Sequence, residues 1–207
     1  MSAARGLLAS KPALALLLTL AYAAVTIAIY LVHARWFPVG VVLYGALLDA
    51  AIAAAIMAIV LWLFVPGPFT GFERVLLVSV WLVGGYAFAI SGPTVLDRSL
   101  SFYIIEKLQQ RGGGVREDAI GDIFISEYMP EFRLVDVRLT EQLESGTIVI
   151  EDGCVKLTPM GDRLASFSRY VRTHLLPRHR LLAGEYTDAL VDPFENSPTG
   201  PMGYECG

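Results

Sequence analysis

One acidic residue lies inside a long apolar stretch, and its type and place make it the first candidate for chemistry. Asp49 stands ten residues into the run 39–65, which holds no other charged residue. An ionised carboxylate at such a place costs about 2.5–3.5 kcal/mol on insertion scales, so it normally faces a bundle interior or a partner. Three interpretations stay open: a proton or ion step, a contact with a cation on another subunit, or a helix-packing hydrogen bond to a hydroxyl such as Tyr22, Thr26 or Tyr86.

Small residues recur at helical spacing in the same apolar run. Ala46, Ala50 and Ala54 follow one another every four residues. Small side chains let helices approach closely in lipid, where packing drives association. The stripe therefore predicts a close helix contact, either within the chain against Gly84 and Gly85 or against a larger membrane protein. We take Asp49 and the three alanines as candidate partner contacts.

The other residue types that could carry chemistry form no catalytic or metal-binding pattern. The three histidines, His33, His174 and His179, lack metal-ligand spacing, and the two cysteines form no Cys-x-x-Cys motif. No Gly-x-Ser-x-Gly motif occurs either. We therefore expect a non-enzymatic chain with no cofactor and no metal.

The composition separates a membrane part from a water-facing part. The chain has 207 residues, of which 55% are hydrophobic and only 17% are charged, against about 25% charged in a typical soluble domain. Residues 1–93 hold six charged residues, whereas residues 94–207 hold 12 Lys/Arg and 18 Asp/Glu. This split excludes an ordinary soluble enzyme. It predicts one part that lies in the lipid bilayer and one part that lies in water.

Three apolar runs in residues 1–93 predict three transmembrane helices. They cover approximately residues 12–32, 39–65 and 75–92. About 20 apolar residues in a helix cross a hydrocarbon core of about 30 Å, so each run is long enough. The lipid bilayer is thus the first expected partner.

The side of the membrane is only weakly indicated by charge. Three spans place the termini on opposite sides, and the basic residues near the membrane count four on the C-terminal side against three on the other. The type of C-terminal domain, argued next, favours a cytoplasmic position for it.

The first water-facing elements are expected to be three helices. Thr94 and Asp97 fit a capping box ahead of the first, which ends at the glycines 112–114. The second is expected over residues 116–128 and the third over residues 133–144.

A hairpin and a fourth helix follow. The Asp152-Gly153 pair suits a two-residue type I′ turn, which pairs Ile150 with Val155 and Ile148 with Leu157 on one face. Cys154 then lies on the other face, as a plain thiol. Thr158 caps the next helix, and four apolar residues are expected to face the core: Leu164, Phe167, Val171 and Leu175.

This order of helix, helix, helix, hairpin and helix is that of a winged helix. The run 143–165 (LESGTIVIEDGCVKLTPMGDRLA) resembles the wing segment of MarR- and PadR-type regulators, and the resemblance covers residues 97–176. It implies a winged-helix fold for residues 94–176 and, by analogy with those families, a transcription regulator.

Charge disfavours nucleic acid as the partner of this domain. Phosphate contacts by Lys and Arg supply most of such affinity, yet residues 94–180 hold 12 Lys/Arg and 13 Asp/Glu. In the third helix Arg133 and Arg138 are outweighed by acidic residues such as Glu141, and the wing tip is the acidic pair 151–152. Protein contact is the better expectation, with Arg133, Arg138 and Glu141 as candidate contacts.

The sequence therefore predicts a mostly α membrane protein: three transmembrane helices, a winged-helix domain and a tail. The tail, residues 177–207, is expected to be partly surface-bound or disordered. The favoured function is a non-catalytic accessory, assembly or regulatory subunit of a larger integral-membrane complex. Two alternatives are a membrane-tethered transcription regulator and an enzyme component with Asp49 in a proton or lipid path.

Overall fold

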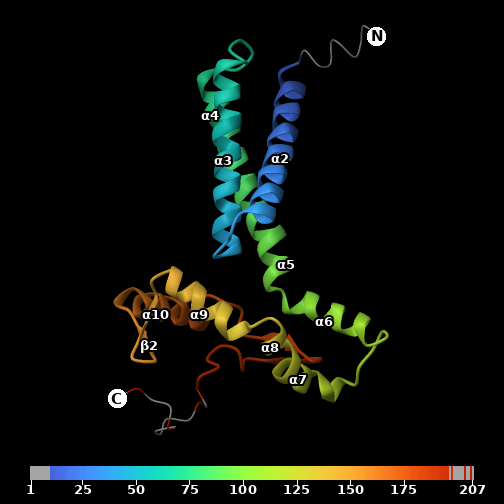
Figure 1. Cartoon of the computed structure of the whole chain (residues 1–207), viewed down its shortest axis with the longest axis vertical. Coiled ribbons are helices and arrows are strands. Elements are labelled where there is room, and N and C mark those ends of the chain that lie inside the picture. Colours follow the sequence, from blue (N-terminus) through green and yellow to red (C-terminus); the bar gives the residue numbers. More distant parts are fainter. Residues whose placement is uncertain (1–9, 196, 198–202, 204–205, 207) are drawn as a thin grey trace. The chain divides into compact units, whose positions relative to one another are not determined.

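The structure divides the chain into two compact units. It is a computed structural model that describes residues 10–195, 197, 203 and 206 (Figure 1). One unit is Met1–Phe132 and the other is Arg133–Gly207. The boundary falls inside the segment that the sequence predicts as a single winged helix, residues 94–176.

Three long helices in the first unit confirm the predicted spans. They are α2 (Lys11–Trp36), α3 (Val42–Leu63) and α4 (Gly71–Ala89) (Figure 1). All three are long and apolar enough to cross a membrane, the third together with the turns that follow it as far as Arg98. Helix α2 ends at Trp36, four residues beyond the predicted limit at residue 32. It ends there because Phe37 precedes Pro38, and a residue before proline disfavours the helical conformation.

The ends of the helices fix their directions. Lys11 Nζ lies 3.2 Å from Glu73 Oε1, which joins the first turns of α2 and α4, so these two helices run the same way and α3 runs opposite. A reciprocal capping box starts α4: Glu73 N donates to Thr70 Oγ1 over 3.3 Å and Thr70 N donates to Glu73 Oε2 over 2.6 Å. The sequence prediction missed this cap, which signals the helix start four residues before residue 75.

The core of the three-helix bundle is apolar with a few hydroxyl contacts. Trp81 and Leu61 are its largest fully buried side chains. The ring of Trp81 stacks on Tyr22 with centroids 5.7 Å apart, and its Nε1 donates to Thr19 Oγ1 over 3.1 Å. These contacts join α2 to α4 and give the indole N–H the partner that it needs in an apolar setting.

Gly85 on α4 lies close to both α2 and α3. A Cβ placed there would lie 2.7 Å from the Cβ of Ala50 and in collision with the hydroxyl of Tyr22. Of the two contacts that the sequence left open for the small-residue stripe, the one within the chain is found for Ala50, which lies against this glycine.

Replacing Gly85 with alanine is expected to destabilise the bundle by about 1–3 kcal/mol, the usual cost of overpacking. The neighbouring Gly84 is a matched control, because a Cβ there meets nothing within 4 Å. Thermal unfolding of the two purified variants in the same detergent measures the difference. Equal melting temperatures for Gly85→Ala and Gly84→Ala would contradict the packing described here.

The helix expected to start at Thr94 starts later. The chain leaves α4 through a π-helical turn (Ile90–Thr94) and α5 (Val95–Arg98), and Thr94 makes no capping hydrogen bond. Ser99 is the residue that breaks the helix, with extended backbone, and its hydroxyl accepts from Phe102 N over 3.3 Å. The predicted cap at Thr94 is therefore wrong, since the spanning helix continues through Pro93 and leaves no free helix start there.

The next segment folds back on the helix α6 (Leu100–Gln110). It runs through η2 (Glu117–Ala119), α7 (Ile120–Ile123), η3 (Phe124–Tyr128) and α8 (Met129–Glu131). Buried Lys107 on α6 joins the two sides, because its Nζ lies 2.9 Å from Glu131 Oε1 and 3.0 Å from Glu127 Oε2. Hydrogen bonds to Glu131 and Glu127 raise the pKa of Lys107, so it stays charged at neutral pH.

Acid is expected to loosen the contact of α6 with η3. Hydrogen bonds from Arg111 and then Lys107 hold the pKa of Glu127 below its ordinary value of 4.5. A lowered pKa stabilises the fold above the ordinary value, and this contribution is lost as pH falls through the lowered one. The protection factors of the amides of residues 100–131, corrected for the intrinsic pH dependence of exchange, should therefore fall below about pH 4.5. Glu127→Gln should remove most of that pH dependence, and an unchanged profile would contradict the role of this carboxylate.

The second unit contains the predicted hairpin in its predicted register. Helix α9 (Leu134–Glu144) precedes β1 (Ile148–Glu151) and β2 (Cys154–Leu157). Ile150 pairs with Val155 and Ile148 with Leu157. Asp152 and Gly153 both have positive φ, of 51° and 77°, as a type I′ turn requires.

Helix α10 (Pro159–His174) also starts as predicted, but its apolar face is not buried. Thr158 Oγ1 accepts from Gly161 N over 3.1 Å and caps the helix. Of the four expected core positions, Val171 is partly buried, whereas Leu164, Phe167 and Leu175 are 53%, 64% and 67% exposed, so the prediction that these three face a core is wrong. The sheets of the described chain are two small hairpins, and the winged helix is not confirmed.

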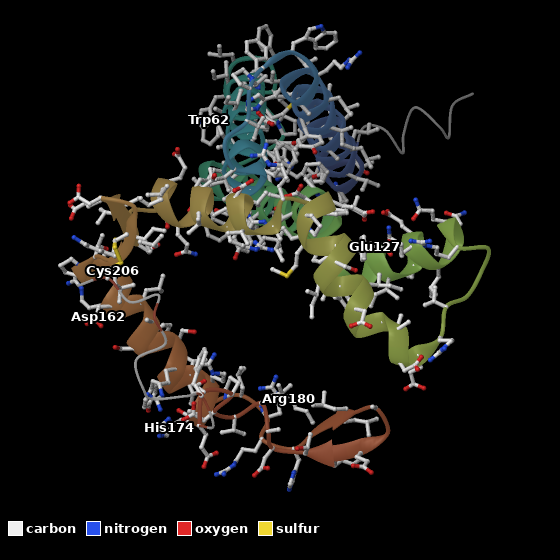
Figure 2. All side chains as sticks on the ribbon, turned by 60° about the horizontal axis from the view of Figure 1, so that its bottom comes forward. Trp62, Glu127, Asp162, His174, Arg180 and Cys206 are labelled. Carbon is white, nitrogen blue, oxygen red and sulfur yellow. A yellow bond between two sulfur atoms is a disulfide. The ribbon has the colours of Figure 1, made fainter. Side chains whose placement is uncertain are left out.

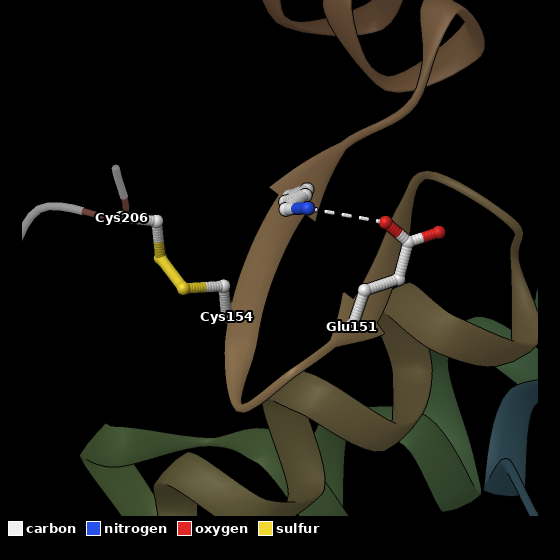
Figure 3. The surroundings of a disulfide bond; sticks show 4 residues. Glu151, Cys154 and Cys206 are labelled. Carbon is white, nitrogen blue, oxygen red and sulfur yellow. Dashed lines mark hydrogen bonds and ion pairs between the residues drawn. A yellow bond between two sulfur atoms is a disulfide. The ribbon is translucent and has the colours of Figure 1, made fainter.

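The tail is more ordered than expected and is tied to the wing hairpin. A second hairpin forms from β3 (Arg180–Leu182) and β4 (Glu185–Thr187). Cys154 on β2 is bonded to Cys206, so the expectation of a plain thiol at Cys154 is wrong (Figures 2 and 3). The rest of the last dozen residues, for which disorder is expected, lies largely outside the described part of the chain.

Candidate functional site

The buried carboxylate of the bundle pairs with a histidine of the same chain. Asp49 lies in the second turn of α3 and is 2% exposed. Its Oδ1 is 2.7 Å from Nδ1 of His33, which lies in the last turn of α2. The extra turn of α2 beyond residue 32 is what brings His33 into reach, because the short connection to α3 then places both side chains near the same end of the bundle.

The pair explains how an acidic residue is tolerated inside an apolar bundle. Removing a carboxylate from water costs several kcal/mol, which a close and hydrogen-bonded partner offsets. The partner is the imidazole of His33 and none of the three expected hydroxyls. Tyr22 instead contacts the backbone of Ala50, with its hydroxyl 3.4 Å from that carbonyl oxygen, and Thr26 donates to the carbonyl of Tyr22 over 2.9 Å.

Two cavities meet at this pair. The larger has a volume of about 460 Å³ and is otherwise lined by apolar side chains of α2, α3 and the turn between them, among them Ala28, Phe37 and Ile52. The smaller, of about 180 Å³, is lined by residues nearer the turn. Both contain His33 and Asp49 in their linings. An apolar hollow of this size with one polar pair has the general composition of a small-molecule site.

The small-residue stripe lies inside the bundle. Ala46, Ala50 and Ala54 are between 1% and 4% exposed. The structure therefore shows the alternative of packing within the chain for these three residues. A contact with a partner through them stays a prediction, and it would require the helices to separate.

The charged candidates of the second unit form ion pairs along α9. Arg133 Nε lies 2.8 Å from Asp136 Oδ2, and Arg138 Nη1 lies 2.9 Å from Glu141 Oε2. Both arginines thus share their charge with a carboxylate of the same helix. Arg133 also has a left-handed backbone, with φ of 45°, at the start of α9. Partner contact by Arg133, Arg138 and Glu141 remains a prediction.

Some of the exposed apolar side chains of the second unit follow two regular faces. On the wing hairpin, Ile150, Val155 and Leu157 are all about half exposed and share one face by their register. Leu164 and Phe167 on α10 and Leu175 at its C-cap fall on one face by their spacing. Figure 2 shows α10 between the labelled Asp162 and His174, with side chains standing away from the ribbon. We call these six residues the apolar docking faces.

The remaining histidines do not assemble a metal centre. Within the described residues, no group of three or more His, Cys, Asp or Glu side chains could hold a metal ion. His174 stacks on Tyr170 with ring centroids 4.5 Å apart, and its Nδ1 lies 2.7 Å from Thr173 Oγ1. The interactions of His174 are thus local to the last turn of α10.

The sequence analysis singled out Asp49 but missed its partner. A signal was present: His33 and Asp49 are complementary ionisable residues, each within two turns of the same short connection between two apolar runs. Helices joined by so short a connection lie antiparallel, so such residues come to the same level of the bundle. The predicted end of the first span at residue 32 concealed this relation.

Comparison with protein-family models, with curated proteins and with solved structures found no match to this chain.

Proposed function

We propose that this chain is a non-catalytic accessory, assembly or regulatory subunit of a larger integral-membrane complex. In this proposal the helices α2 to α4 anchor it in the bilayer, and the elements after residue 94 form a recognition lobe of winged-helix type. The observation that carries the proposal is the exposure of the apolar docking faces, on the hairpin and on α10.

Exposed apolar faces favour a partner protein. Large apolar patches on a folded surface mark interaction sites, because their burial removes apolar area from water. Phe167 alone is 64% exposed, at a position where a winged helix would bury it. Aromatic and aliphatic side chains of this kind are the usual anchors of protein interfaces.

Electrostatics supports the choice of protein over nucleic acid. Arg133 and Arg138 are paired with carboxylates of their own helix. At the wing tip the ammonium of Lys156 lies 3.2 Å from Glu151 Oε2, so its charge is also compensated (Figure 3). Cations that are compensated in this way contribute little to the counterion release on which affinity for a phosphate backbone depends.

The test is site-specific photo-crosslinking from the lobe in native membranes. A photoreactive residue at position 164 should crosslink to a defined integral-membrane protein, and the full chain should migrate with it in native electrophoresis after mild solubilisation. Phe167→Asp should abolish both results. Tyr186→Asp is the matched control, since Tyr186 lies on β4, outside the docking faces, and is 73% exposed. A monomer without crosslinks would overturn the proposal.

We further propose that the lobe lies on the side of the membrane away from the cytoplasm. The charge count favours the cytoplasm by only four basic residues to three. The bond between Cys154 and Cys206 supports the opposite side, because disulfides persist in oxidising compartments and are rare in the cytosol. This placement disfavours the alternative of a membrane-tethered transcription regulator.

Thiol accessibility in intact cells tests this placement. Both cysteines should resist a membrane-impermeant maleimide until an impermeant reductant is added, and should then react together. Reaction with a permeant maleimide without any reductant would overturn the placement and return the regulator alternative to consideration.

A further inference from the structure

The larger cavity is an open hollow on the side of the bundle, with Val32, Phe37 and Leu48 of its lining 48%, 60% and 56% exposed, and it has the composition of a site for a membrane-soluble molecule. It is about 460 Å³, and its lining consists of six apolar side chains and the His33–Asp49 pair. Ligand sites of about 300–1,000 Å³ are mostly apolar with a few polar groups that fix orientation. Here the polar groups are confined to one pair, so a ligand would be held by an apolar body and by a single polar head.

The position of the pair along the helices sets the depth of that head. His33 lies three residues before the end of α2, or about 4.5 Å along its axis. Asp49 lies seven residues after the start of α3, or about 10 Å. Trp36 and Phe37 follow directly, and aromatic rings of this kind mark the membrane interface. The head would thus lie just below the interface, with the apolar body beside the deeper residues Ala28 and Ile52.

The chemistry of the pair selects an uncharged head. Asp49 engages Nδ1 of His33, which leaves Nε2 as the hydrogen-bonding group of the ring: an acceptor in neutral imidazole and a donor in imidazolium. The carboxylate gives the pair a net charge of zero or minus one, so it does not attract phosphate or carboxylate heads. A hydroxyl or a carbonyl can exchange a hydrogen bond with Nε2 in one or other protonation state.

We infer that the cavity at His33 and Asp49 binds an uncharged, lipid-soluble molecule that carries a hydroxyl or carbonyl head, from either of two sources: a lipid alcohol or a quinone-type ring. This inference is independent of the accessory-subunit proposal, because the bundle can hold such a molecule with or without a partner on the lobe.

The test follows His33 by nuclear magnetic resonance in the full chain, with its histidines isotopically labelled, in detergent micelles. His33→Gln assigns the resonance by its loss, and His174 and His179 serve as internal controls. The probes are a decyl-substituted benzoquinone, a monoacylglycerol and, as a charged-head comparison, myristate. The two neutral probes should shift the His33 ring nitrogens in a saturable manner, whereas myristate should not.

Variants separate the cavity from a general effect of the probes. Ala28→Phe fills the cavity from its apolar side without touching the pair, and should weaken the apparent affinity by about tenfold or more, equivalent to about 1.4 kcal/mol. Ala24→Phe is the matched control, since Ala24 is exposed on the same helix and does not line this cavity. A shift with the benzoquinone alone assigns the quinone source, and a shift with the monoacylglycerol alone assigns the lipid alcohol. No shift, an equal shift with myristate, or a shift that survives Ala28→Phe would overturn the inference.

Discussion

Replacing Gly161 with alanine is expected to detach the wing hairpin from α10. A Cβ at this position would collide with the backbone carbonyl oxygen of Thr147 and would lie 2.9 Å from a methyl group of Leu157. The carbonyl of Thr147 cannot move away as the end of a flexible side chain could, because it also accepts a hydrogen bond from Thr158 N over 3.1 Å at the helix cap. The cost should therefore reach or exceed the upper end of the range of about 1–3 kcal/mol for overpacking.

Hydrogen exchange resolved along the full chain measures this effect where it occurs. The amides of β1, β2 and α10 should lose protection in Gly161→Ala, while those of α2 to α4 should keep it. Gly121→Ala is the control, because Gly121 lies in α7, where an added Cβ would meet nothing within 4 Å, and helix propensity there favours alanine by about 0.5–1 kcal/mol. Full protection of the hairpin in Gly161→Ala would refute the close approach of these two backbones.

Replacing His33 with leucine is expected to be the most damaging single change in the bundle. It leaves the carboxyl of Asp49, which is 2% exposed, without the ring nitrogen that lies 2.7 Å away. Breaking a buried pair by removing one partner costs about 3–5 kcal/mol, because a buried charge stays uncompensated or must take up a proton. The melting temperature of the full chain in detergent should fall accordingly.

The double variant His33→Leu with Asp49→Leu distinguishes loss of the pair from loss of packing. An apolar pair of similar volume is often neutral or stabilising relative to a buried ion pair. The double variant should therefore recover most of the stability that His33→Leu loses. If the double variant is as unstable as the single one, the pair is not what holds Asp49 in the bundle, and steric packing accounts for the loss. The double variant should also fail to bind the neutral probes even though it folds, which separates the role of the pair in binding from its role in stability.

The two sets of candidate residues therefore have different roles in the structure. The intramembrane residues that the sequence pattern nominated for a partner are used within the chain, by the His33–Asp49 pair and by the packing of Ala50 against Gly85. In the second unit, by contrast, apolar residues expected in a core are exposed. A partner that covers Phe167 and Leu164 would bury these two side chains, which are exposed in the isolated chain.

The sequence alone determined those features that depend on neighbours along the chain. Long apolar runs predicted the three spanning helices, since length and composition decide which segments can cross a membrane. The Asp152-Gly153 turn and the alternation around it predicted the hairpin register, and Thr158 with Pro159 predicted the start of α10. Each of these signals acts within a few residues, so no distant contact is needed to interpret it.

Tertiary structure decided which faces and side chains meet. The partner of Asp49 is set by the extra turn of α2, and the failure of Thr94 as a cap is set by the continuation of the spanning helix through Pro93. The exposure of Phe167 and the bond from Cys154 to Cys206 depend on what lies opposite them in space, across 52 residues in the case of the disulfide. Hydrophobic spacing marks a face as suited to burial, but it does not say which surface covers it, and that choice belongs to the packing of the whole chain and its partners.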